Sequence, residues 1–113
     1  MNRIILEMGM GADLYGEDYT KAACRAVDDA IRHSSLLLFR SLDLPHEKMQ
    51  VNVTVGVQSP DEVDVETVAA KLPRGQAHVK AVHGGQNISH DEFGTVSVIA
   101  SVAIEALYPF DEG

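Results

Sequence analysis

The segment that decides the fold reads MQVNVTVGV and spans residues 49–57. From Val51 to Val57, every second residue is valine, and the residues between them are polar or small. Such strict alternation of β-branched and polar residues predicts a strand with one apolar and one polar face. It is the clearest strand in the chain.

Two elements are predicted upstream of this strand. Residues 3–8 are apolar and β-branched and predict a first strand, which Gly9 would stop. Residues 18–42 have apolar residues at helical spacing and predict a long helix with Asp18 as its N-cap. Residues 43–45, Asp-Leu-Pro, would end this helix.

A short second helix is predicted downstream. Residues 59–62 read Ser-Pro-Asp-Glu, which has the form of a capping box with proline at the first helical position. The helix would extend to Leu72, and Asp64 is an alternative start.

The remainder of the chain is predicted to form two more strands. Residues 77–83 alternate again and predict a third strand, and residues 84–94 are predicted as a polar loop. Residues 95–108 predict a long fourth strand. Its second half, residues 101–107, also fits a helix, and both alternatives stay open.

This βαβαββ order predicts one α/β (α+β) domain over residues 1–113, with a mixed four-stranded sheet and two helices on one face. Right-handed crossovers would make the first three strands parallel and the last one antiparallel to them. The other sheet face, rich in Val and Ala, would then meet water or, more in keeping with its composition, another subunit. The loops at residues 9–17, 56–60 and 84–93 would share the end of the sheet where open α/β sheets bind ligands.

Composition excludes several function classes. Nine basic and seventeen acidic residues give a net charge of −8, whereas nucleic-acid binding needs clustered Lys and Arg. No apolar run approaches the roughly 18 residues of a membrane span, and no signal peptide is recognisable. Cys24 is the only cysteine, which rules out a disulfide within the chain and favours a reducing compartment, so we expect a cytoplasmic protein without membrane contact.

The richest chemical signal is the segment GMGADLYG, residues 9–16, between the first strand and the first helix. Its glycines permit close backbone approach, but the glycine spacing does not match the dinucleotide fingerprint, there is no Walker lysine, and Asp13 would repel a phosphate. Two interpretations of Asp13 stay open. It caps the turn, or it binds a ligand or metal.

Other candidates lie at the same predicted end of the sheet. Histidine is a common acid–base residue, and His83 precedes Gly84 and Gly85, which allow a ligand to come close; the alternative is a half-exposed strand-end histidine. Cys24, next to Arg25, is either a packing residue or a somewhat acidified thiol. There is no histidine pair of metal-ligand spacing, so neither a metal nor a cofactor is predicted.

These residues resemble an uncharacterised family of bacterial and plant proteins, the "lin" conserved-hypothetical family. Its hallmark is Gly-x-Gly-x-Asp-x-His-Gly, which matches Gly9, Gly11, Asp13 and Gly16, while Tyr15 stands in place of the histidine. The resemblance continues through residues 20–27, Val57, residues 63–66 and residues 84–85. The family implies no established function.

A more distant similarity is to methylerythritol cyclodiphosphate synthase, whose fold resembles that of the Bacillus-type chorismate mutase. Asp13 and Tyr15 occupy the positions of its Asp-x-His metal pair, and its third ligand falls near Arg25. Because two of three metal ligands are absent, the similarity implies architecture rather than chemistry, namely a trimer with clefts between subunits. An Asp13–Arg25 ion pair in place of the metal is a further hypothesis.

Three function classes remain open. In an enzyme acting on a small polar metabolite, Asp13 and His83 would be the catalytic acid and base. The ligand would be held by Gly9, Gly11, Tyr15, Gly16, Lys21, Arg25, Gly84 and Gly85. The alternatives are a non-catalytic module that binds a small molecule in the same cleft between subunits, and a homo-oligomeric structural protein without a ligand.

Overall fold

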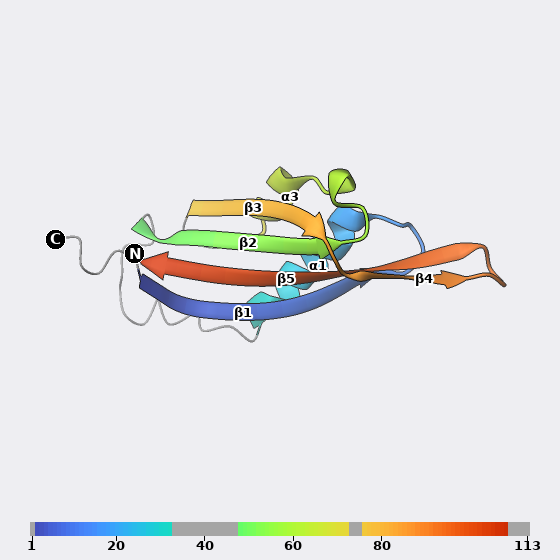
Figure 1. The fold of residues 1–113 in the computed structure, drawn as a ribbon, viewed down its shortest axis with the longest axis horizontal. Helices are drawn as coiled ribbons and strands as arrows, with labels where there is room; N and C mark the ends of the chain where they lie inside the picture. Colours follow the sequence, from blue (N-terminus) through green and yellow to red (C-terminus); the bar gives the residue numbers. More distant parts are fainter. Residues whose placement is uncertain (1, 33–47, 73–75, 109–113) are drawn as a thin grey trace.

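A five-stranded mixed sheet forms the centre of the molecule (Figure 1). The computed structural model describes residues 2–32, 48–72 and 76–108. The strands are β1 (Asn2–Asp13), β2 (Gln50–Val57), β3 (Gln76–His83), β4 (Gln86–His90) and β5 (Thr95–Tyr108). Their order is β1-β5-β2-β3, and β4 pairs with β5. β5 is antiparallel to β1, β2 and β4, whereas β2 and β3 are parallel, which confirms the predicted strand directions.

Helices cover one face of this sheet. They are α1 (Tyr19–Arg32) and α3 (Val65–Ala69), and the one-turn 3-10 helix η2 (Pro60–Glu62) precedes α3. α1 packs on β1 and β5, and α3 packs on β3 and on α1. The core between the layers is built from valines, alanines and a few larger side chains, among them Tyr19, Met49, Ile104 and Tyr108. The mixed α+β architecture is therefore confirmed, while the predicted extension of the first helix to residue 42 lies outside the described residues.

Three features differ from the prediction, and one open alternative is settled. The second helix, predicted to extend to Leu72, ends at Ala69. β1 does not stop at Gly9, because its pairing with β5 continues to Asp13 opposite Val98. The predicted loop at residues 84–94 contains β4, so the sheet has five strands rather than four. The sequence of β4, Gln-Asn-Ile-Ser-His, has no apolar alternation that would predict a strand. In the structure all of its residues are exposed. The predicted strand over residues 95–108 is confirmed, and the helical alternative for residues 101–107 is excluded.

Gly9 and Gly11 face α1 and allow it to lie close against β1. A Cβ atom on Gly11 would overlap the backbone nitrogen of Ala26 and lie 2.5 Å from the carbonyl oxygen of Ala22. A Cβ on Gly9 would lie 2.5 Å from the carbonyl oxygen of Ala26. The helix surface opposite is made of fully buried alanines, so both sides of this contact lack bulky side chains. The glycine pattern thus serves helix–strand packing.

Side chains of α1 also reach around the outer edge of β1. The backbone N–H of Met10 donates to Oδ2 of Asp29 at 3.0 Å, and Nη1 of Arg25 donates to the carbonyl oxygen of Ala12 at 2.6 Å. These contacts satisfy outward-pointing backbone groups that an edge strand otherwise offers to another chain.

Asp64, the alternative helix start, is the N-cap of α3. Its side chain accepts hydrogen bonds from the backbone N–H groups of Glu66 and Thr67, whereas Ser59 makes no side-chain cap before η2. Hydrogen bonding from the Thr67 hydroxyl, at 2.8 Å, is the main reason why the pKa of Asp64 lies below its ordinary value. The ionised carboxylate therefore favours the folded state.

Asp64→Asn is expected to lower stability only where Asp64 is ionised, because asparagine imitates the protonated carboxyl. The stabilisation is present above the ordinary pKa of 3.8 and is lost as the pH falls through the lower pKa of the folded protein. Melting temperatures of the wild type and the variant, measured from about pH 7 to about pH 2, should converge at the acid end. A gap that persists unchanged to the lowest pH would contradict the assignment.

Candidate functional site

The helix-free face of the sheet carries three rows of side chains, fixed by the strand register. Each row runs from β1 through β5 and β2 to β3. The rows are Leu6–Glu105–Asn52–His78, then Met8–Ala103–Thr54–Lys80, then Met10–Ser101–Gly56–Val82. In the second and third rows the two central residues are small, and the outer residues are longer. The register alone therefore produces a depression along the middle of this face.

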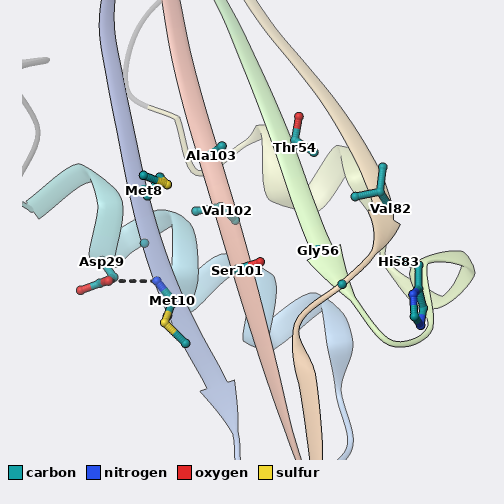
Figure 2. A pocket seen from close by; sticks show the side chains of 12 residues that line it. Met8, Met10, Asp29, Thr54, Gly56, Val82, His83, Ser101, Val102 and Ala103 are labelled. Atoms are coloured by element: carbon teal, nitrogen blue, oxygen red, sulfur yellow. Dashed lines mark hydrogen bonds between the residues drawn. The ribbon is translucent and has the colours of Figure 1, made fainter.

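This depression is a groove of about 620 Å³ on the helix-free face. Figure 2 shows Met8 and Met10 on one side, Val82 and His83 on the other, and the small residues of β5 and β2 between them. Met8 is 68 % exposed, Met10 is 62 % and Val82 is 37 %. The volume lies within the range of small-molecule sites, which are typically apolar with a few polar groups.

A polar hollow of about 370 Å³ adjoins the groove and shares Thr54 with it. Asn52, His78, Lys80 and Glu105 line this hollow. Nε2 of His78 lies 2.7 Å from Oε1 of Gln50, which orients the ring. Lys80 forms no ion pair with any other described residue. The site thus combines an apolar groove with one polar end that carries both a lysine and a glutamate.

Gly84 and Gly85 close the opposite end of the groove. They carry the chain from the end of β3 across the end of β2 to the position of β4. The N–H of Gly84 donates to the carbonyl oxygen of Val57 at 2.9 Å, and Nε2 of Gln58 donates to the carbonyl oxygen of Gly84 at 3.0 Å. Gly85 has a φ of +61°, and a Cβ there would overlap the carbonyl oxygen of Ile99. This crossing therefore requires glycine for its backbone conformation and its tight contacts.

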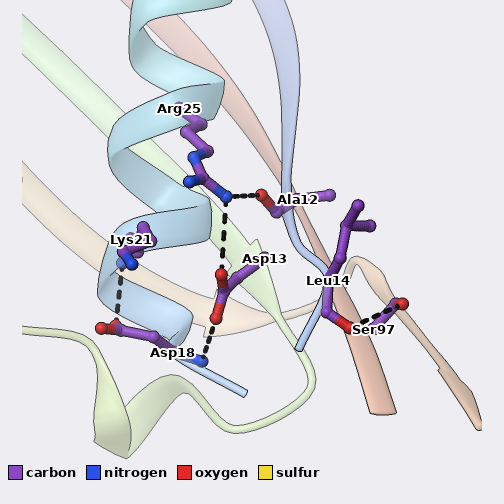
Figure 3. Close-up of polar contacts among 7 residues, drawn as sticks. All are labelled: Ala12, Asp13, Leu14, Asp18, Lys21, Arg25 and Ser97. Carbon is purple, nitrogen blue, oxygen red and sulfur yellow. Dashed lines mark hydrogen bonds and ion pairs between the residues drawn. The ribbon is translucent and has the colours of Figure 1, made fainter. Parts of the chain in front are cut away.

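Asp13 does not reach the groove. It lies on the helix side of β1, is 6 % exposed, and accepts a hydrogen bond from the backbone N–H of Asp18 at 2.9 Å (Figure 3). Nη1 of Arg25 lies 3.5 Å from Oδ1 of Asp13, so the proposed ion pair is present. Asp18 in turn accepts from the N–H of Lys21 at 2.9 Å, as expected of the N-cap of α1. The capping interpretation of Asp13 is therefore the one that the geometry supports.

The predicted catalytic pair is not brought together. β5 and β2 lie between β1, which carries Asp13, and β3, which carries His83. Three strand spacings correspond to roughly 14 Å, too far for shared acid–base chemistry on one substrate atom. His83 is exposed at the rim of the groove, and Asp13 is engaged in the turn before α1.

The predicted ligand-binding residues divide into three places. Gly9 and Gly84 contribute to the groove lining, together with His83. Gly11 and Arg25 contact α1 and the edge of β1. Tyr15, Gly16 and Lys21 lie in the turn after β1 and at the exposed start of α1, away from the groove. Their role in ligand binding remains a prediction.

No cluster of three or more metal-ligating side chains occurs in the described ranges 2–32, 48–72 and 76–108. Cys24 is half-buried, and burial raises the pKa of its thiol, an effect that Lys71 partly opposes. The thiol is therefore a weaker nucleophile at neutral pH than a free cysteine, which favours its packing role. Within the same ranges, no helix is long and apolar enough to cross a membrane.

Comparison with known proteins gives a family match and similar solved structures. The model of a family described as conserved hypothetical protein (Lin0512_fam) matches residues 3–106. The crystal structure of an FtsZ-like protein of unknown function from Nostoc punctiforme PCC 73102 superimposes with a TM-score of 0.81. That protein is 35 % identical, and the alignment covers 95 % of each chain. None of the curated proteins matches this chain.

Proposed function

We propose that this chain, which belongs to the Lin0512 family of conserved hypothetical proteins, binds a small molecule in the groove on its helix-free sheet face. The observation that carries the proposal is the groove of about 620 Å³ with a floor of small residues and walls of methionine and valine. Since both the family and the similar structure are of unknown function, the proposal rests on this geometry alone.

Polar groups on the groove floor are available to a ligand. The hydroxyls of Thr54 and Ser101 form no hydrogen bond with any other described residue, and both side chains are only partly exposed. Both hydroxyls can therefore donate a hydrogen bond to a ligand in the groove without losing a partner within the protein. With Lys80 at one end and apolar walls along the rest, the groove suits a molecule with an apolar body and an anionic or hydrogen-bond-accepting end.

Binding is favoured over catalysis by the position of the titratable groups. Asp13 is used to hold the turn into α1, while His83 and Asp29 line opposite sides of the groove, and the side chain of Asp29 accepts a hydrogen bond from the backbone N–H of Met10. An acid and a base that act on one substrate atom must both lie within hydrogen-bond reach of it.

The groove is open on one side, and we propose that another copy of the chain completes it. Met8 and Met10 are more than half exposed, and with Leu6 they form a continuous apolar strip on β1. Exposed apolar strips of this kind are typical of interfaces rather than of solvent-facing surfaces. This supports a homo-oligomer with its ligand in a cleft between subunits; a trimer is the specific form we propose.

The test uses 8-anilinonaphthalene-1-sulfonate, a fluorescent probe with an apolar ring system and an anionic end. Saturable binding to the native protein is expected. Ala103→Phe, which fills the groove floor, should weaken binding about tenfold or more, equivalent to about 1.4 kcal/mol. Val65→Phe is the matched control, because Val65 is 38 % exposed on α3, on the other face of the sheet.

Both variants must retain a cooperative thermal transition, since partly unfolded proteins also bind this probe. If folded Ala103→Phe binds the probe as tightly as the wild type, the groove is not the binding site and the proposal is wrong.

A further inference from the structure

We infer that a two-stranded ribbon, residues 88–97, docks into the groove of a second copy of this chain and supplies the missing wall of the cleft. The inference rests on the proposed function, because it names the partner that completes the same groove. It is carried by three features of the ribbon: its projection from the sheet, its apolar tip and its charge.

The ribbon projects from the sheet because its two strands extend beyond the ends of β1 and β2. β1 pairs with β5 only as far as Asp13 opposite Val98, and β2 begins to pair with β5 at Ser101. Residues 95–97 of β5 therefore pair only with residues 88–90 of β4. Figure 1 shows this hairpin extending beyond the end of the sheet. A two-stranded ribbon is marginally stable without packing, and all of β4 is exposed, so this ribbon has a face to bury.

The end of the ribbon carries exposed apolar side chains. Phe93 is 78 % exposed and Ile88 is 41 %. Tyr15, 79 % exposed, and Leu14, 50 % exposed, extend this apolar surface from the turn after β1. Leu14, Tyr15 and Phe93 line one hollow of about 260 Å³. The tip therefore combines residues from two distant parts of the sequence.

Buried Ser97 ties these two parts together. Its hydroxyl donates to the carbonyl oxygen of Leu14 at 3.2 Å (Figure 3). Nε2 of His90 lies 2.9 Å from Oγ of Ser97. Since the hydroxyl is already engaged, Ser97 fixes the tip rather than acting as a nucleophile. A fixed tip loses little conformational entropy when it binds.

Charge orients the tip in the groove. Asp91 and Glu92 precede Phe93 at the ribbon's turn, Lys80 stands beside Glu105 on the β3 side of the groove, and Asp29 lines the β1 side. When Phe93 of one copy lies between the β1 methionines and Val82 of the other copy, the carboxylates of Asp91 and Glu92 lie on the side of Lys80. Complementary charge around an apolar contact favours this orientation over the reverse one.

The partner must be another copy rather than the same chain. β5 leads straight from the ribbon into the groove floor at Ser101 and Ala103, so the ribbon points away from its own groove. Two different surfaces then meet, and the contact is head-to-tail, which closes into a ring or continues as an open chain. The competing arrangement is a face-to-face dimer in which two helix-free faces meet without the ribbon.

The experiment uses one tip variant, Phe93→Asp, and one groove variant, Met10→Asp, with Val65→Asp as the matched control. Sedimentation velocity and light scattering give the mass of each. We expect an oligomer for the wild type and Val65→Asp, and a monomer for each of the other two variants. An equimolar mixture of the two variants should form a one-to-one dimer, because the intact tip of Met10→Asp meets the intact groove of Phe93→Asp.

Three results would overturn the inference: a monomeric wild type, an oligomer of unchanged mass for Phe93→Asp, or a mixture that stays monomeric. The second result would identify the face-to-face arrangement. Failure here is distinguishable from failure of the proposed function, because probe binding by the Phe93→Asp protein, with and without Ala103→Phe, tests the groove without the ribbon. A monomeric wild type that binds the probe through its groove would refute ribbon docking alone.

Discussion

Gly11→Ala is expected to lower the free energy of unfolding by about 3 kcal/mol or more, and Gly11→Val is expected to prevent folding. The added Cβ overlaps the backbone nitrogen of Ala26 and lies 2.5 Å from the carbonyl oxygen of Ala22. Because both are backbone atoms of α1, the clash cannot be relieved by rotating a side chain. The whole helix would have to move away from β1 and expose the core. Urea denaturation followed by circular dichroism measures the loss.

The control for this prediction is Gly94→Ala. Gly94 has a φ of +66°, and a Cβ there would meet no atom within 4 Å. Its replacement therefore adds only the cost of a left-handed backbone, about 1–2 kcal/mol. If Gly11→Ala were no more destabilising than Gly94→Ala, the close contact between α1 and β1 would not be what requires glycine at this position.

Asp13→Ala is expected to lower the free energy of unfolding by about 2–3 kcal/mol. The substitution removes a nearly buried carboxylate and leaves the N–H of Asp18 and the guanidinium of Arg25 without this partner. The turn from β1 into α1 would then lose its main internal bond. Thermal and urea unfolding measure the effect.

The ion pair within this turn is measured by a double-mutant cycle of Asp13→Asn and Arg25→Met. A coupling of about 0.5 kcal/mol or more is expected, although Arg25 is half exposed and water weakens the interaction. Strictly additive losses would show that the two side chains do not interact energetically. The cap formed by Asp13 on Asp18 would then be the sole role of this carboxylate.

The parts of the fold that could be predicted from sequence are those in which local pattern and tertiary structure agree. The valines at alternate positions of β2 are buried against the helices, and Asp18 caps α1. The end of the first strand was predicted wrongly at Gly9 because glycine usually weakens a strand. Only the close packing of α1 explains why glycine is needed inside β1. β4 was missed because a strand exposed on all its residues has no apolar alternation.

The candidate site was harder to predict because it depends on register. Met8, Ala103 and Thr54 are far apart in sequence and become neighbours only through the pairing of β5 with β1 and β2. His83 and Gly84 were identified because the end of a strand can be read locally. For Asp13, a turn-capping role and a ligand-binding role were both open, and only the position of the Asp18 N–H in the folded chain favours the cap.

The position of β5 in the sheet has a consequence for how the protein folds during synthesis. β5 is the last strand in sequence, yet it is the shared neighbour of β1, β2 and β4, and Asn2 pairs with Tyr108. Until residues 95–108 have left the ribosome, β1 has no strand to pair with, and the Val-rich β2 has only β3. Apolar residues of β1 and β2 therefore stay exposed until β5 has been synthesised, and chains in this state are prone to aggregate. Contacts between residues so far apart in sequence also form slowly. Folding of this domain should begin only after its last strand emerges, and chaperone binding to the nascent β2 segment is the expected safeguard.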